Sequence, residues 1–154
     1  MSNEDFIHLA SKFENFHRHL GNIALHFLTS PLGILGSLII FKSFIKFSLL
    51  VPALVYLYIL FLASLVPIGV FVGTLLVFIG VAIFSHYSNL GGWFGIAILV
   101  GCYFAQDASH YLFSEATFQS SYSTNTYQVV AIYVIVSMMN CFLNMNDLTV
   151  TRIW

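Results

Sequence analysis

Charged side chains are scarce in this chain of 154 residues, since its five Lys or Arg and six Asp or Glu make up only 7% of it. Apolar residues account for 59%, whereas an ordinary soluble domain is about 45–50% apolar and about 25% charged. So few charges cannot solvate the surface of a globular domain, and most of them lie outside long apolar runs. The composition therefore excludes a water-soluble globular protein and predicts an all-α bundle of helices embedded in a membrane.

The sequence also lacks the patterns of several functional classes. The net charge is −1, and the few Lys and Arg residues form no cluster that could bind phosphates. Nucleic acid is therefore excluded as a partner. The two cysteines, Cys102 and Cys141, stand alone in apolar stretches and form neither a CxxC motif nor a disulfide framework. No zinc-protease helix, phosphate-binding loop, Rossmann turn or GxSxG motif occurs, and no inverted repeat marks a transporter.

Five apolar runs are assigned as membrane spans, since a spanning helix needs about 20 mostly apolar residues. A polar segment over residues 1–22 comes first, a single transmembrane bundle follows over 23–146, and residues 147–154 form a short tail. The expected spans are residues 23–41, 47–65, 68–84, 93–104 and 127–145, of which the fourth can extend past residue 110. Four spans plus an interfacial segment is the alternative.

Glycines recur at a spacing of four in two of these runs, as Gly69 and Gly73 and as Gly91 and Gly95. Small residues at this spacing let membrane helices approach closely. We interpret them as contacts between helices of one bundle, with no further role.

Histidines are the polar residues that most need an explanation, because ionisable groups at membrane depth are costly and usually face a site or a partner. The six are His8, His17, His19, His26, His86 and His110. In a helix that continues through residue 26, His19, Asn22 and His26 fall on one face. The alternative interpretation of these histidines is a polar seam, that is, a row of polar side chains that hold the helices of the bundle together.

Chain direction adds a test, because it alternates between successive spans. The start of the first span and the end of the fourth therefore lie on the same side of the membrane. Six side chains could converge there, namely His17, His19, Asn22, His26, Asp107 and His110. His86, at the end of the third span, comes out on the other side. Three or four imidazoles with one carboxylate suit iron, zinc, copper or nickel and leave coordination positions open, and the spacing does not choose the metal.

A set of polar, proline and glycine positions at fixed spacing carries a resemblance to a known family. The set is His17, Asn22, His26, Pro31, the Pro67-x-Gly69 pair and the Gln106-x3-His110 pair. Its order and separations resemble those of a small integral membrane family that includes the fungal 2-hydroxy fatty acid dioxygenase of phytosphingosine breakdown and bacterial relatives. The resemblance covers about residues 16–122.

The resemblance implies ferrous iron held by histidines, and a reaction in which O2 shortens a 2-hydroxy fatty acid by one carbon. The implied iron ligands are His17, His26, His110 and, more weakly because of its side, His86. The candidates for contacts to the substrate or to the ligands are Asn22, Gln106, Asp107 and His19. We prefer His17 to His19 as a ligand because a chain break near residues 20–21 would spoil the helical stripe. The substrate headgroup would lie at the membrane boundary, with its acyl chain among the spans and membrane lipids.

Three departures from the family pattern favour an alternative function. Leu20 stands where the family commonly has Pro, Ser109 stands where it has Gly, and the residues after His110 lack its basic residues and Pro, with Glu115 shifted. The alternative is a non-catalytic accessory subunit of a large respiratory or photosynthetic membrane complex, with other membrane subunits as partners. We expect the protein to be located in the endoplasmic reticulum or in the mitochondrial inner membrane, and the sequence does not distinguish between the two.

Overall fold

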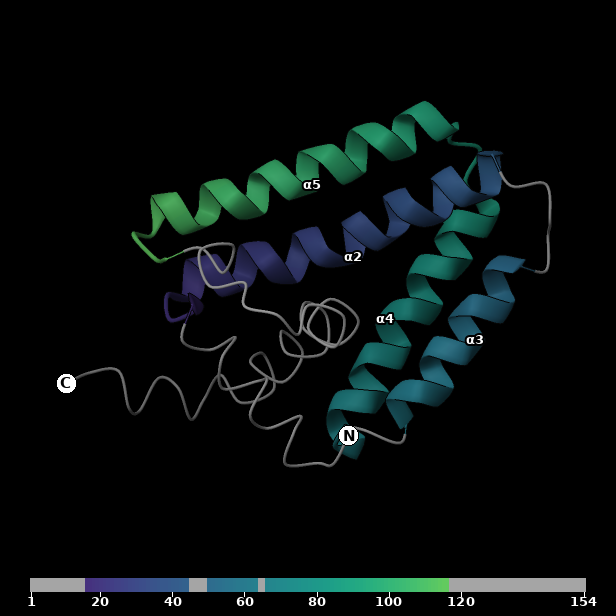
Figure 1. Cartoon of the computed structure of the whole chain (residues 1–154), viewed down its shortest axis with the longest axis horizontal. Coiled ribbons are helices and arrows are strands. Elements are labelled where there is room, and N and C mark those ends of the chain that lie inside the picture. The colour runs from purple at the N-terminus through teal and green to yellow at the C-terminus, as the bar shows by residue number, and fades with distance from the viewer. Residues whose placement is uncertain (1–15, 45–49, 64–65, 117–154) are drawn as a thin grey trace, which may run out of the picture.

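The computed structural model of the chain describes residues 16–44, 50–63 and 66–116 and is all-α within these ranges. Within these ranges four helices follow one another: α2 (Leu20–Phe44), α3 (Leu50–Ala63), α4 (Ile68–Tyr87) and α5 (Gly92–Leu112). Figure 1 shows two pairs of helices that diverge from a shared end. In one pair α2 lies along α5, and in the other α3 lies beside α4.

The predicted all-α fold is therefore confirmed for the described residues. The predicted membrane spans are confirmed in part. α2, with 25 residues, and α4, with 20, are long and apolar enough to cross a membrane. The described part of α3 has 14 residues, and α5 has 21 but becomes polar in its last turns. The fifth run, at 127–145, lies outside the described residues, as do most of the polar N-terminal segment and the C-terminal tail.

Two glycines set the closest approach of α2 and α5. A Cβ atom added at Gly36 would lie 2.7 Å from the carbonyl oxygen of Gly95, and one added at Gly95 would lie 2.7 Å from the carbonyl oxygen of Gly36. The two backbones can touch here because neither residue has a side chain. Gly91, which shares the four-residue spacing with Gly95, faces open space in the described part of the chain.

Lys42 joins the far end of α2 to the end of α4. Its ammonium group donates hydrogen bonds to the carbonyl oxygens of Ser85 at 3.0 Å, His86 at 2.8 Å and Ser88 at 2.9 Å. The last carbonyl groups of a helix have no partner within the helix and carry partial negative charge, so a cation there is stabilising. This contact fixes the end of α4 at the end of α2 that lies farthest from Leu20.

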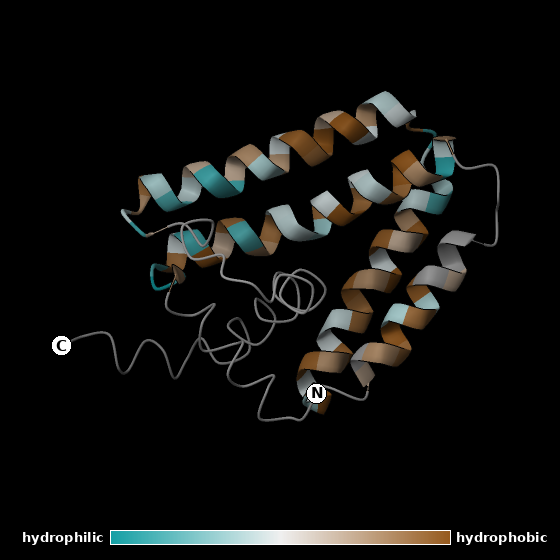
Figure 2. Ribbon diagram, in the orientation of Figure 1, coloured by the Kyte–Doolittle hydropathy of each residue, from teal (hydrophilic) through white to brown (hydrophobic). Residues whose placement is uncertain are grey.

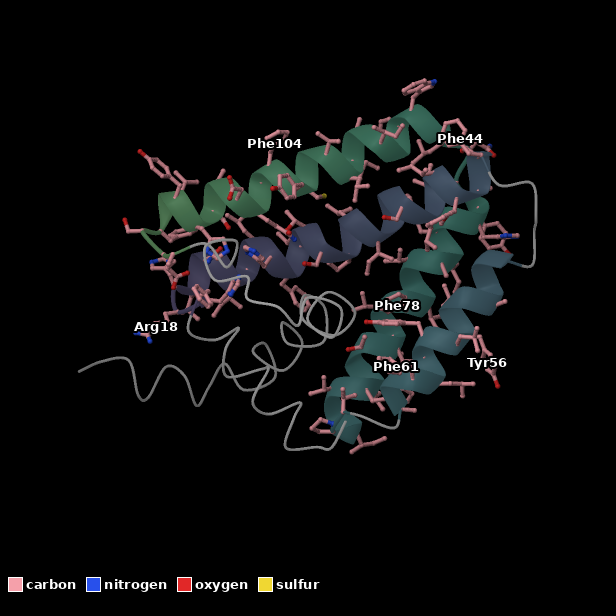
Figure 3. All side chains as sticks on the ribbon, viewed as in Figure 1. Arg18, Phe44, Tyr56, Phe61, Phe78 and Phe104 are labelled. Atoms are coloured by element: carbon pink, nitrogen blue, oxygen red, sulfur yellow. The ribbon has the colours of Figure 1, made fainter. Side chains whose placement is uncertain are left out.

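Large apolar side chains are exposed on the outer faces of α3, α4 and α5. Tyr56 on α3 and Phe104 on α5 are each more than 60% exposed and point away from the helices in Figure 3. Figure 2 shows hydrophobic residues along most of the four helices, with a hydrophilic group where α2 begins and α5 ends. Exposed apolar surfaces of this extent are typical of faces that contact lipid or a protein partner.

Candidate metal site

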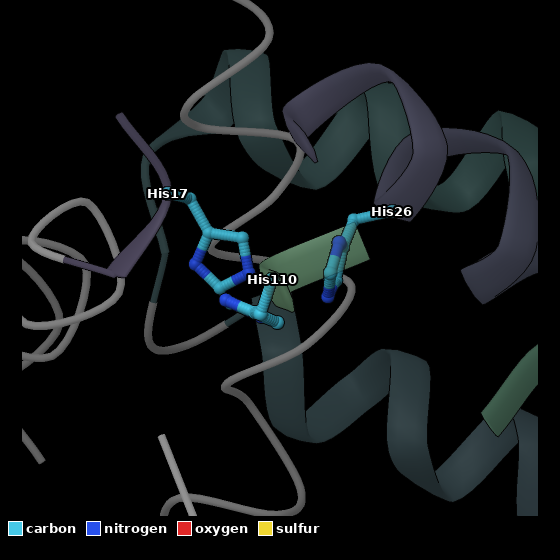
Figure 4. Close-up of side chains that lie close together, drawn as sticks. All are labelled: His17, His26 and His110. Atoms are coloured by element: carbon cyan, nitrogen blue, oxygen red, sulfur yellow. The ribbon is translucent and has the colours of Figure 1, made fainter. Parts of the chain in front are cut away.

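Three histidines from separate parts of the chain meet where α2 begins and α5 ends. His17 lies in the segment before α2, His26 lies on α2, and His110 lies near the end of α5. One ring nitrogen from each side chain lies within 4.8 Å of the other two. All three residues are at most 5% exposed, and Figure 4 shows their rings turned toward one another.

The placement of the three rings fits a shared metal ion. Their centroids are 4.4 Å apart for His17 and His26, 4.7 Å for His17 and His110, and 5.0 Å for His26 and His110. A metal about 2.1 Å from each ring nitrogen would place two centroids about 4.5 Å apart at right angles and about 5.2 Å apart at a tetrahedral angle. The interplanar angles of 82°, 74° and 80° also suit rings that converge on one point.

The hydrogen bond of His26 leaves one of its nitrogens for a metal. Its Nδ1 lies 3.1 Å from the backbone carbonyl oxygen of Asn22. Because a carbonyl oxygen only accepts, Nδ1 carries the proton and donates it. The lone pair of His26 is then on Nε2, which is the arrangement usual for metal-binding histidines.

The side chain of Asn22 connects the start of α2 with the end of α5. Asn22 is fully buried, and its Nδ2 donates a hydrogen bond of 2.6 Å to Oε2 of Glu115 and lies 3.3 Å from Nδ1 of His110. Its Oδ1 accepts a hydrogen bond of 2.5 Å from the hydroxyl of Ser109. A buried amide needs partners for both its donors and its acceptor, and its second N–H reaches the carbonyl oxygen of Phe16 at 3.4 Å.

Gln106 extends these polar contacts by one helical turn. Its Nε2 donates hydrogen bonds of 3.0 Å to the hydroxyl oxygens of Thr29 and Ser30 on α2. This predicted candidate for a substrate contact therefore joins α5 to α2 and forms part of a polar seam. Asp107, one turn before His110, is exposed and lies outside the three-histidine group.

His19 caps α2 and does not join the other histidines. Its Nδ1 accepts a hydrogen bond of 3.1 Å from the backbone N–H of Gly21, and its exposed ring stacks on Phe113 at 4.2 Å. The helical stripe through residues 19, 22 and 26 does not form, because α2 begins at Leu20. The structure accordingly brings His17 to the site.

His86 lies far from the three-histidine group. It is exposed near the end of α4, where Lys42 holds its carbonyl group. Lys42 and His26 are 16 positions apart on α2, which is roughly 24 Å at a helical rise of about 1.5 Å per residue. His86, the predicted fourth ligand, therefore lies at the opposite end of α2 from the other three histidines and is not part of their group.

Two residues of the site were not predicted from the sequence, namely Ser109 and Glu115. Ser109 is fully buried and bonds Asn22, at the position where the resembling family has Gly. Glu115 is the only charged residue between Asp107 and Asp147, and this isolation was the available signal. The hydrogen-bond partners of Ser109 and Glu115 depend on the residue at which α2 begins, and the sequence pattern did not determine that residue.

Comparison with known protein families, characterised proteins and solved structures finds no match to this chain.

Proposed function

We propose that this chain is an iron-dependent membrane enzyme that uses O2 to shorten 2-hydroxy fatty acids by one carbon. The observation that supports the proposal is the buried group of His17, His26 and His110. Three neutral imidazoles hold iron and leave coordination positions open. The group lies at the end of apolar helices, where a fatty acid can place its headgroup at the site and its acyl chain in an apolar surrounding.

The proposed reaction balances without a further reductant. A 2-hydroxy acid R–CH(OH)–COOH and O2 give the shortened acid R–COOH, CO2 and H2O. The bond between the carboxyl carbon and its neighbour breaks, and the electrons that the substrate loses are those that O2 gains. Iron bound at the histidines would supply a Lewis acid and a template for the substrate.

The residues of the chain would orient and shield this chemistry. The carbonyl group of Asn22 holds the ring of His26. Arg18 is exposed beside His17 and is the only cation at this end of the described part of the chain. Its charge favours an anionic headgroup, in place of the basic residues that the resembling family carries after its histidine.

We further propose that the chain is a bundle that spans either the membrane of the endoplasmic reticulum or the mitochondrial inner membrane. α2 and α4 have the length and composition of spans, and we propose α3 and α5 as the second and fourth of five. The fifth would be the apolar run at 127–145. The site would then lie at the level of the lipid headgroups.

The test measures iron content and turnover together. Purified protein loaded with Fe(II) is expected to hold close to one iron per chain and to consume O2 with a long-chain 2-hydroxy fatty acid. The same fatty acid without the hydroxyl group should support no consumption. His26→Ala should abolish both iron binding and turnover, whereas His86→Ala, at the exposed histidine near the end of α4, should preserve both.

A different outcome would favour the accessory-subunit alternative. The exposed apolar faces of α3 and α5 suit neighbouring subunits as well as lipid. Wild-type protein that is stable, binds no iron and co-purifies in fixed proportion with other membrane subunits would contradict the enzyme and support that alternative.

A further inference from the structure

We propose that Glu115 is a positioning residue that closes the metal site by fastening the segment of His17 to the end of α5. The inference rests on the proposed function in one respect, because it requires a metal at the three histidines. His17 precedes α2 and belongs to no continuing helix. Its ring can therefore stay beside His26 and His110 only if other contacts fix the backbone around it.

One oxygen of the Glu115 carboxylate supplies such contacts. Oε1 accepts hydrogen bonds from the backbone N–H groups of Arg18 and, at 2.7 Å, of His19. These are the two residues that directly follow His17. They also lie at the start of α2, where unpaired N–H groups and the positive end of the helix dipole favour a carboxylate.

The other oxygen ties the same carboxylate to the site from the opposite side. Oε2 accepts the 2.6 Å hydrogen bond from Nδ2 of Asn22, which in turn lies 3.3 Å from Nδ1 of His110. A single side chain thus connects the backbone after His17 with the amide that packs against His110. Loss of this link would free one of the three ligands while α2 and α5 remain packed.

The chain turns sharply after α5 to bring Glu115 to this place. Ser114 adopts the left-handed conformation, with φ of 55°, and the N–H of Glu115 donates a hydrogen bond of 2.9 Å to the carbonyl oxygen of His110. Phe113 stacks on His19 and occupies the space where a side chain at residue 21 would project. Residues 113–115 therefore hold the start of α2 at two points, one apolar and one ionic.

The hydrogen-bond pattern provides a specific substitution test. In Glu115→Gln the remaining oxygen can still accept from the backbone, but the new amide would face Nδ2 of Asn22, donor against donor. Adding Asn22→Asp replaces that donor with an acceptor and restores the pairing with residue 115 at unchanged net charge, with the loss of the longer hydrogen bond of 3.4 Å to the carbonyl oxygen of Phe16. If the side chain of Glu115 only filled space, the second substitution would not restore metal binding.

Titration with Co(II) measures the effect through affinity and through the visible absorption of the bound ion. We expect Glu115→Gln to bind Co(II) about 10- to 100-fold more weakly than wild type, the usual loss when a group that orients a ligand is removed. The double variant with Asn22→Asp should recover the affinity and the absorption spectrum. Asp107→Asn, which removes an exposed carboxylate of α5, is the matched charge control and should bind like wild type.

Limited trypsin digestion tests the same contact without any metal. Cleavage after Arg18 should be faster in Glu115→Gln than in wild type, because the neutral amide, which faces the donor Nδ2 of Asn22, holds the N–H groups on both sides of that bond less firmly than the carboxylate does. Cleavage after Lys42 is the internal reference and should be unchanged. The double variant should again resist cleavage after Arg18.

Each outcome bears on the inference. Equal Co(II) affinity and equal spectra in wild type and Glu115→Gln would overturn the positioning role and leave the proposed function standing. Wild type that binds no Co(II) would overturn both. Where Glu115→Gln does not fold, as judged by its circular dichroism, the double variant decides the question, and its failure to bind Co(II) would reject the role.

Discussion

At the scale of single residues, the site depends on neutral polar side chains as much as on the histidines. Asn22 both donates and accepts, so it can satisfy Glu115 on one side and Ser109 on the other while it lies beside His110. The histidines could be selected from the sequence, because a polar group in an apolar run demands an explanation. Ser109 could not, because a serine becomes informative only when its partner is known, and the isolated charge of Glu115 did not indicate which residue it would bind.

Removal of the Ser109 hydroxyl should destabilise the protein. Ser109→Ala leaves the buried Oδ1 of Asn22 without its donor, and an unsatisfied buried acceptor costs about 1–3 kcal/mol. We expect a loss of this size in the free energy of unfolding, measured by circular dichroism in detergent micelles with increasing denaturant.

Ser37→Ala is the matched control for this substitution. The Ser37 hydroxyl donates at 3.0 Å to the carbonyl of Gly33 within its own helix, and that carbonyl already belongs to the helical ladder. The control should therefore change stability by only a few tenths of a kcal/mol, since it leaves no buried group unpaired. Equal losses in the two variants would show that Asn22 does not depend on Ser109.

At the scale of helices, the sequence predicted positions better than ends. The runs at 23–41 and 68–84 lie inside α2 (Leu20–Phe44) and α4 (Ile68–Tyr87), and the expected turn at residues 66–67 precedes α4. The run at 93–104 stops before the end of α5 (Gly92–Leu112). Hydropathy marks where apolar residues cease, whereas this helix continues because Gln106 and Ser109 find polar partners on α2.

The contact between α2 and α5 should be sensitive to a single methyl group. In Gly36→Ala the new Cβ would meet the carbonyl oxygen of Gly95 at 2.7 Å and the backbone nitrogen of Leu99 at 3.0 Å. Because these are backbone atoms, the helices must move apart, at a cost of about 1–3 kcal/mol. The same unfolding measurement should detect this loss.

Gly33→Ala, one turn earlier on α2, provides the comparison. Its Cβ would lie 3.9 Å from the Cβ of Cys102, an ordinary contact, and Ala favours a helix over Gly by about 1 kcal/mol. We expect this variant to be as stable as wild type or more stable. Similar destabilisation of both variants would argue against a backbone contact at Gly36.

At the scale of the whole molecule, alternation of chain direction separates two ends. The three histidines lie where α2 begins and α5 ends, and Lys42 and His86 lie at the end that all four helices share. The sequence predicted this separation, because only the order of the runs is needed for it. It did not predict the divergence of the two helix pairs, because crossing angles depend on side-chain packing.

Labelling from one side of a membrane should distinguish these ends. In a chain whose Cys102 and Cys141 are replaced by Ser, His19→Cys and Tyr87→Cys each place one exposed thiol at an opposite end. In sealed vesicles of one orientation, we expect a membrane-impermeant maleimide to label one of the two variants and not the other. After the vesicles are permeabilised, both should react. Labelling of both variants in sealed vesicles would contradict a membrane-spanning α2.

The wide sequence separation of the groups around Asn22 has a consequence for how the site is made in the cell. Asn22 and Glu115 are 93 residues apart, and at about 5–20 residues per second the ribosome needs about 5–19 s to add that length. For most of this interval the nascent chain carries His17 and His26 but lacks His110. A metal at the three proposed ligands could therefore bind only after α5 has been synthesised and has docked on α2, so nascent chains arrested before α5 should carry no metal.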